Sequence, residues 1–189
     1  MRLILTRHAE TDKNISGLVY GNLPSRLTKK GIEQVKLLAD KLRTYNFDKI
    51  YCSDLDRCVE TANLIIAVHE KVPIIYTELL REQEQGSLIG KLVKDVDWHK
   101  LPPDVETPAE MATRARRFLL GLNLTGQQSV LIISHRRFLN TFVNVLVGAS
   151  PEYEDQNQLV KNSSLTIIEC SEVGAGEIVQ ANDVFHLFP

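Results

Sequence analysis

The chain has 189 residues, 43% of them hydrophobic, and its formal net charge is −2 at pH 7. This length and apolar content predict one folded domain, residues 1–189, in preference to two small ones. The charge argues against a nucleic-acid partner, because nucleic-acid binders usually carry a basic excess. No apolar run reaches the roughly 20 residues that span a bilayer, so no membrane partner is expected.

The cysteines and the N-terminus bear on the compartment. Cys52, Cys58 and Cys170 match neither a metal-ligand spacing nor an even set of disulfides. Charge and polarity enter by Arg7, unlike the start of a secretory signal peptide. We expect a reduced, cytoplasmic protein without a metal or another cofactor. The oligomeric state is open, and a homodimer is one option.

Predicted strands and helices alternate along most of the chain. Residues 2–6 read as a buried strand, and apolar residues at helical spacing predict a helix within 28–45. The later elements are a strand at 47–53, a helix at 55–70, a strand at 72–76, an irregular segment at 79–103, a helix that begins at Thr107 and Pro108, a strand at 129–134, a helix at 136–148, and late strands at 164–170 and 177–188.

This alternation predicts an α/β fold, namely a three-layer α/β/α sandwich with a mostly parallel central sheet. The two late strands are joined by a glycine-containing turn at 173–176, so they can add an antiparallel edge. Ligands of open parallel sheets bind outside the carboxyl ends of the strands. The residues at those ends are therefore the first candidates for a functional site.

Charged and reactive side chains stand where the predicted parallel strands end. Arg7 and His8 follow the first strand, Arg57 the second, and His135 the strand at 129–134. Arginine offers a charged planar fork to phosphate oxygens, and a neutral histidine can act as a nucleophile. The N-termini of the helices that follow would add backbone donors. Taken singly, each residue could be structural; taken together, they predict a phosphoryl site.

The chain also resembles a known family. The segments that carry the resemblance are, in order, TRHAET at 6–11, YGNLPSRLTKKG at 20–31, SDLDRCVETA at 53–62, LREQEQGSLIG at 80–90 and ISHRRF at 133–138. In this order they are similar to the histidine phosphatase superfamily, in its phosphoglycerate-mutase-like branch, from Arg2 to about Leu187. The resemblance implies the same sandwich fold.

The resemblance also implies roles for the candidate residues. His8 would be the nucleophile that forms a phosphohistidine, and Glu82 would be the general acid and base. Arg7, Arg57 and His135 would hold the phosphoryl oxygens. Phosphoryl transfer depends mainly on positioning and on neutralising oxygen charge, which such a set of groups can do without a metal.

Two positions are less settled. Asn14 corresponds to an asparagine of the family and would be a further donor to the phosphate. Glu84 is close enough to Glu82 to compete as the acid, but Glu82 holds the family's place after Leu80 and Arg81.

The sequence departs from the family pattern at two places. Ala9 replaces a glycine, which would cost free energy only if the backbone there needed a positive φ. Arg136 stands where the family usually has glycine, directly after His135. Arg136 is a candidate phosphate-binding residue that reaches a second anionic group of the substrate, or else it projects to solvent. Trp98 and His99 belong to the irregular segment that would shape the substrate side, or pack as an ordinary loop.

We therefore expect a metal-independent phosphomonoester hydrolase. Its partner would be a small phosphorylated metabolite, and the small phosphatases that the chain resembles act on α-ribazole phosphate, phosphoserine, sugar phosphates or sugar bisphosphates. The alternatives are a phosphoglycerate-type mutase and a non-catalytic module that binds a phosphorylated ligand. The compact chain and the segment EQEQG, in place of the mutase sequence Glu-Arg-His-Tyr-Gly, favour hydrolysis. Retention of His8 and Glu82 disfavours the non-catalytic module.

Other phosphatase chemistries fit less well. The pair Asp54 and Asp56 is similar to the aspartyl-phosphate motif of haloacid-dehalogenase-like enzymes, but Cys58 stands where threonine or valine is expected. A cysteine phosphatase needs five residues between its cysteine and arginine, and Cys52 is one residue too close to Arg57.

Overall fold

The computed structural model describes residues 1–69, 72–126, 128–151 and 160–188. Within these residues, six strands form one sheet in the order β3-β2-β4-β1-β5-β6. The strands are β1 Arg2–Arg7, β2 Lys49–Ser53, β3 Ile74–Thr77, β4 Ser129–Ser134, β5 Leu165–Glu169 and β6 Glu177–Asp183. The helices are α1 Asp12–Ser16, α2 Lys29–Leu42, α3 Asp56–Ile66, α4 Pro108–Leu120 and α5 Arg136–Val147.

The sheet is mostly parallel, as predicted. Strand β4 pairs in parallel with β1 on one side and with β2 on the other, and β2 pairs in parallel with β3. The late strands form the antiparallel edge, because β5 runs antiparallel to β1 and β6 runs antiparallel to β5. The carboxyl ends of β1, β4 and β2 therefore lie side by side.

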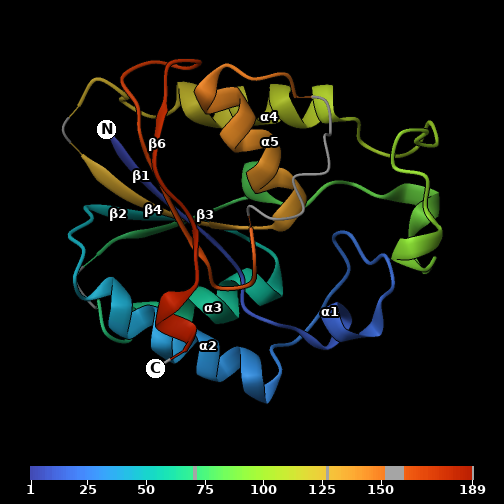
Figure 1. Cartoon of the computed structure of the whole chain (residues 1–189), viewed down its shortest axis with the longest axis horizontal. Coiled ribbons are helices and arrows are strands. Elements are labelled where there is room, and N and C mark those ends of the chain that lie inside the picture. The colour runs from blue at the N-terminus through green and yellow to red at the C-terminus, as the bar shows by residue number, and fades with distance from the viewer. Residues whose placement is uncertain (70–71, 127, 152–159, 189) are drawn as a thin grey trace.

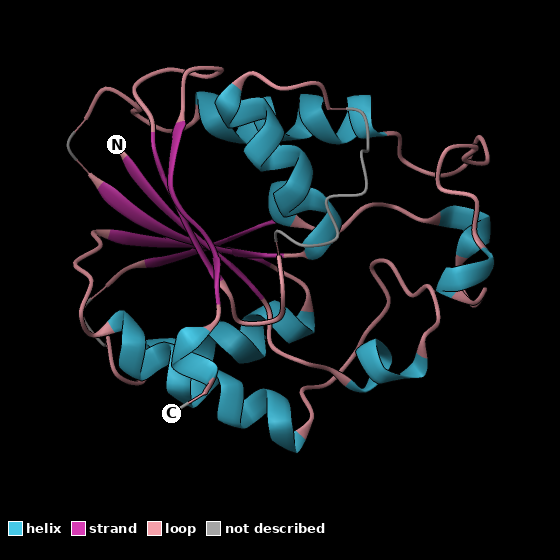
Figure 2. Cartoon of the chain, viewed as in Figure 1, coloured by secondary structure: helices cyan, strands magenta, loops and turns pink. Residues whose placement is uncertain are grey.

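Helices cover both faces of the sheet, which confirms the three-layer sandwich (Figures 1 and 2). In Figure 1, α4 and α5 lie above the sheet and α2 and α3 lie below it. Because successive side chains of a strand point to opposite faces of the sheet, one strand contributes to the core on both sides. Leu3 and Leu5 of β1 pack in the core under α4 and α5, whereas Ile4 packs on the side of α2 and α3.

The helix termini follow the local sequence signals. Thr107 caps α4 and forms a capping box with Glu110, and Pro108 takes the first helical position. Gly148 ends α5 with a φ of 74°, in the left-handed region that favours glycine. A short helix that the pattern analysis did not predict, α1, begins at Thr11 through a capping box with Asn14.

Two predicted elements extend several residues beyond the C-terminal ends of the observed ones. The helix expected at 55–70 ends at Ile66, because the chain turns there toward β3, with the His69 amide donating to the Ile66 carbonyl; residue 70 lies outside the described residues. The strand expected at 177–188 ends at Asp183, because Asn182 has a φ of 47° and Asp183 accepts the Phe185 amide. A 3₁₀ turn then spans Phe185–Leu187.

The irregular segment packs over one side of the sandwich. It contains 3₁₀ turns at 78–80, 86–88 and 93–95. A small apolar cluster of Val19, Leu88 and Val105, with Trp98 against it, anchors this segment to the chain before α2. None of the helices in the described part of the chain is long and apolar enough to cross a membrane.

Candidate active site

The parallel topology brings the predicted strand-end residues together. His8 follows β1 and donates its amide to the carbonyl of Ser134, at the end of β4, with a distance of 3.0 Å. His135 follows β4, and the centroids of the two imidazole rings are 5.2 Å apart. Arg57 reaches the same place from the first turn of α3, because its Nε lies 3.1 Å from Nδ1 of His135.

His8 has the protonation and tautomer of a nucleophile. Its side chain is buried, with 1% of its surface exposed, and its Nδ1 lies 2.8 Å from the carbonyl oxygen of Ala9. A carbonyl can only accept, so Nδ1 carries the proton and Nε2 carries the lone pair. Burial, and then the charges of Arg57 and Arg7, hold the pKa of His8 well below its usual value. The imidazole is therefore neutral at neutral pH.

Arg57 is a buried cation whose neighbours are mostly neutral. The residue is 1% exposed, and its guanidinium donates to the carbonyls of Gly21 and Leu23 at 2.8 and 3.2 Å and lies 5.0 Å from the Tyr20 ring centroid. Arg7 donates to the carbonyl of Val160 at 3.3 Å.

Neither Arg7 nor Arg57 forms an ion pair with a carboxylate among the described residues. The Nε of Arg7 is buried and has no hydrogen-bond partner within those residues. Burial lowers the pKa of the Arg7 guanidinium, and the nearby charge of Arg136 lowers it further. Two desolvated cations beside a neutral imidazole form a site with strong attraction for an oxyanion.

His135 is also neutral. Because a guanidinium only donates, Nδ1 of His135 accepts from Arg57, and Nε2 donates to Oγ of Ser53 at 2.8 Å. Burial, and then the charge of Arg57, keep the pKa of His135 well below its usual value. Its contact with a phosphoryl oxygen stays a prediction.

Glu82 lies at the N-terminus of α5. Its Oε1 accepts the amides of Gln83 and Phe138 at 3.0 and 3.1 Å, and its Oε2 accepts the amide of Arg137 at 3.4 Å. The sequence predicts that the N-terminus of α5 donates to the phosphate, but its Arg137 and Phe138 amides donate to the Glu82 carboxylate, which occupies the positive end of the helix. Glu84, the competing acid, is exposed and accepts from Asn22 at 3.0 Å.

Asn14 lies beside the site but is engaged by protein groups. Its Nδ2 donates to the Tyr20 hydroxyl at 2.7 Å, and its Oδ1 accepts from Nδ2 of Asn162 at 3.2 Å. Asn162 also donates to the carbonyl of His8 at 2.8 Å, so it fixes the backbone of His8. Sequence reasoning missed Asn162, because nothing near it in the chain marks it and its partners lie about 150 positions away.

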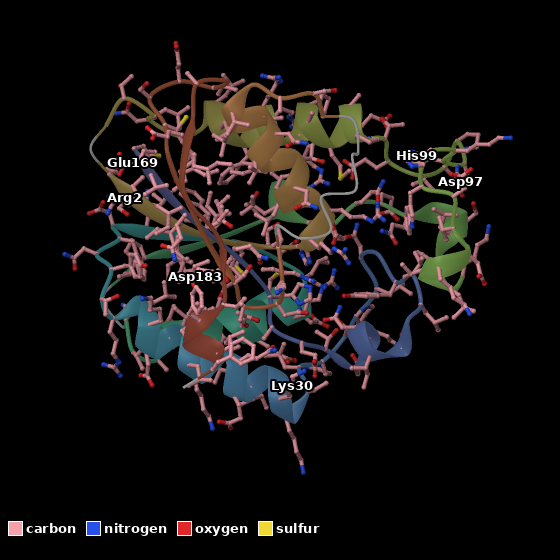
Figure 3. All side chains as sticks on the ribbon, viewed as in Figure 1. Arg2, Lys30, Asp97, His99, Glu169 and Asp183 are labelled. Carbon is pink, nitrogen blue, oxygen red and sulfur yellow. The ribbon has the colours of Figure 1, made fainter. Side chains whose placement is uncertain are left out.

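A cleft of about 380 Å³ lies beside the site, and His8, Arg57 and His135 are buried behind its lining rather than part of it. Its lining includes Arg7, Asn14, Glu82, Trp98, Arg136 and Arg137. Arg136 therefore lines the cleft, and the Arg137 guanidinium lies 3.4 Å from the centre of the Trp98 ring. A larger hollow of about 740 Å³ lies at the other end of β1, where Arg2 and Glu169 are among its lining residues. Figure 3 labels these two residues, and none of the predicted site residues lines the hollow.

Ala9 fits its place without strain. Within the described residues, only Ser163 and Asn182 among non-glycine residues have a positive φ. The Ala9 amide donates to Oγ1 of Thr61 at 3.2 Å, and its methyl group is buried in the core on the side of α2 and α3. The methyl group that replaces the family's glycine is therefore accommodated.

The buried histidines predict a pH-dependent stability. His8 and His135 stay neutral when folded, since both pKa values lie well below the ordinary 6.5, whereas the unfolded chain protonates them near that value. Their contribution to stability is complete above pH 6.5 and is lost as the pH falls below it. The free energy of unfolding should fall with a slope approaching about 1.4 kcal/mol per pH unit for each histidine.

Urea unfolding between pH 7.5 and 5.5, without phosphate, measures this slope. The variant His8→Gln should remove the contribution of one histidine, a slope of up to about 1.4 kcal/mol per pH unit. His69 and His186, whose pKa values burial also lowers, contribute to the slope that remains. A free energy of unfolding that does not change over this range would contradict the neutral, buried state of the two site histidines.

Known proteins point to one family. The sequence profile of the histidine phosphatase superfamily (branch 1) matches residues 3–184. The probable phosphatase C1687.21 of Schizosaccharomyces pombe is 32% identical, over 99% of this chain and 95% of that protein. The adenosylcobalamin/alpha-ribazole phosphatase of Escherichia coli is 32% identical, over 80% of this chain and 82% of its own length. The structure of Bacillus stearothermophilus YhfR is similar with a TM-score of 0.88 at 26% identity, covering 98% of each chain. The chain therefore belongs to the histidine phosphatase superfamily, as one of its phosphatases.

Proposed function

We propose that the protein hydrolyses a small phosphate monoester without a metal ion, through a phosphohistidine on His8. The observation that carries this proposal is the neutral His8, with its lone pair on Nε2, beside Arg7 and Arg57, which have no carboxylate partner among the described residues. A covalent intermediate divides hydrolysis into two easier steps.

In the first step, Nε2 of His8 attacks phosphorus and the bond from phosphorus to the ester oxygen breaks. Glu82 acts here in its protonated form, gives its proton to that leaving oxygen and becomes a carboxylate. In the second step, water attacks the phosphohistidine while Glu82 takes a proton from the water, and the P–N bond breaks. His8 returns to its neutral form and inorganic phosphate leaves.

Arg7 and Arg57 hold the phosphoryl oxygens during both steps. They are already desolvated, so their attraction for the developing oxygen charge costs little reorganisation. His135 joins them when a bound phosphoryl group replaces Ser53 as the acceptor of its Nε2–H, while Nδ1 keeps accepting from Arg57. Asn14 supports the pocket wall through Tyr20 and Asn162.

The test of the function is an assay of the intact protein with EDTA, on an aryl phosphate and on the metabolite classes named above. We expect release of inorganic phosphate that EDTA does not reduce. Transfer between positions of a phosphoglycerate, primed by a bisphosphate, would instead indicate a mutase. Binding of phosphorylated ligands without any turnover would indicate a non-catalytic module.

Arg136 is proposed to bind a second anionic group of the substrate, since it lines the cleft one residue after His135. The matched pair 3-phosphoglycerate and glycerol 3-phosphate differs in a carboxylate. We expect Arg136→Gln to lower kcat/KM for the first about 10-fold more than for the second, the usual value of a hydrogen bond to a charged group. Equal losses on both esters would contradict this role.

We also propose that residues 1–189 act as one domain in the cytoplasm. The match to the family over residues 3–184 supports the single domain. The three cysteines are free and buried in the structure, as in a reducing compartment.

A further inference from the structure

Arg114, on α4, is the centre of a partly buried hydrogen-bond cluster outside the cleft. Its side chain is 17% exposed and pairs with Glu106, which is 16% exposed. The pairing is bidentate, with Nε to Oε1 at 2.9 Å and Nη2 to Oε2 at 2.8 Å. Such a forked pair has a defined geometry, unlike a single contact between flexible surface charges.

The same guanidinium binds the backbone that carries Glu82. Nη1 donates to the carbonyls of Leu79 and Arg81 at 3.0 and 2.7 Å, and Nη2 donates to the carbonyl of Glu82 at 3.3 Å. This stretch belongs to no long helix or strand, so its carbonyls need partners from elsewhere. With the two bonds to Glu106, the contacts engage all five N–H groups of an arginine.

Arg114 also contacts the element that holds the Glu82 carboxylate. Its guanidinium lies 4.4 Å from the centroid of the Phe138 ring, in the first turn of α5. The amide of Phe138 is one of the donors to Oε1 of Glu82. Arg114 thus touches both the main chain of Glu82 and the residue that fixes its side chain.

Glu106 strengthens this arrangement from the other side. Its amide donates to the carbonyl of Glu84 at 2.8 Å, and its Oε2 accepts the amide of Glu84 at 3.2 Å. Its carbonyl accepts from Nε2 of Gln83 at 2.6 Å. The segment 82–84 is therefore tied along its length to residues just before α4.

We propose that Arg114 is a positioning residue that sets the place of Glu82, and thereby the proton transfer to the leaving oxygen. The inference rests on the proposed function, in which Glu82 is the general acid. Arg114 does not line the cleft; it contacts the carbonyl of Glu82 and the Phe138 ring, and its charge is a lesser contribution to the lowered pKa of His135. Its main route to the substrate is therefore the position of Glu82. General acid catalysis matters most for a poor leaving group, because a good one departs without a proton.

The experiment compares kcat/KM on p-nitrophenyl phosphate, which has a good leaving group, with kcat/KM on glycerol 3-phosphate, which has a poor one. For Arg114→Lys and Arg114→Met, we expect a loss of about 100-fold on glycerol 3-phosphate and less than about 5-fold on p-nitrophenyl phosphate. Glu82→Gln should show the same selective pattern. The double variant Glu82→Gln with Arg114→Lys should be no worse than Glu82→Gln, because both changes remove one function.

Arg116→Met is the matched control, since Arg116 is an exposed arginine on the same helix and should change neither activity. Circular dichroism and thermal unfolding establish that each variant is folded; lysine keeps the charge at position 114, so Arg114→Lys carries the test if Arg114→Met does not fold.

Equal losses on both esters in folded Arg114→Lys, with Glu82→Gln still selective, would overturn the positioning role and leave the proposed function standing. A Glu82→Gln variant without selectivity would refute the acid role of Glu82, and the positioning role with it.

Discussion

Replacement of His8 by alanine is expected to lower kcat/KM for phosphate release by about 10⁴-fold or more, the scale on which loss of a covalent nucleophile acts. The reason is geometric and electrostatic. The Ala9 carbonyl places the lone pair on Nε2, and burial with the neighbouring arginines keeps the ring neutral. Steady-state kinetics on an aryl phosphate, with EDTA present, measure the loss.

Arg7 and Arg57 remain in this variant, so binding of inorganic phosphate should survive. His99→Ala is the matched control: His99 is exposed beside Asp97 on the irregular segment (Figure 3) and does not line the cleft, so this variant should retain full activity. A folded His8→Ala protein that kept a tenth of the activity would mean that another group attacks phosphorus.

Replacement of Arg57 by methionine is expected to lower kcat/KM by about 10³-fold, as for removal of a preorganised donor to a transition-state oxyanion. Arg57 is buried and has no carboxylate partner among the described residues. Its charge is therefore not neutralised by those residues and can stabilise a phosphoryl oxygen. The change also leaves the carbonyls of Gly21 and Leu23 without their donor, at about 1–3 kcal/mol each.

Kinetics should therefore be measured below the lowered unfolding temperature. Arg57→Lys keeps one charge but cannot reproduce the fork, so it should recover only part of the loss. Arg43→Met, at an exposed arginine paired with Asp40 at the end of α2, should leave the kinetics unchanged. An Arg57→Met protein with an unchanged kcat/KM would remove Arg57 from the phosphoryl site.

Much of the fold was predictable because the periodicity of the chain is regular. The strands Arg2–Arg7 and Ser129–Ser134 are built on the continuous apolar runs 3–5 and 130–133, as parallel strands covered on both faces must be. Those strands also led to His8 and His135, since parallel strands end at the same edge of the sheet.

The contacts that complete the site could not be predicted in this way. The docking of Glu82 on the amides of α5 joins residues about 55 positions apart. Asn162 and Arg114 likewise act over distances in the chain that no local pattern reports. The ends of α3 and β6 depended on single turns, at Ile66 and at Asn182, where tertiary contacts outweigh propensity.

The most direct test of the account is to trap the phosphoenzyme. The protein would be mixed with a phosphate ester, quenched in alkali after milliseconds, digested and mapped by mass spectrometry, with phosphorus NMR to distinguish the two ring nitrogens. The account predicts an acid-labile phosphate on Nε2 of His8, formed fast enough to precede phosphate release. Turnover without any label on His8, or with the label on another residue, would contradict it.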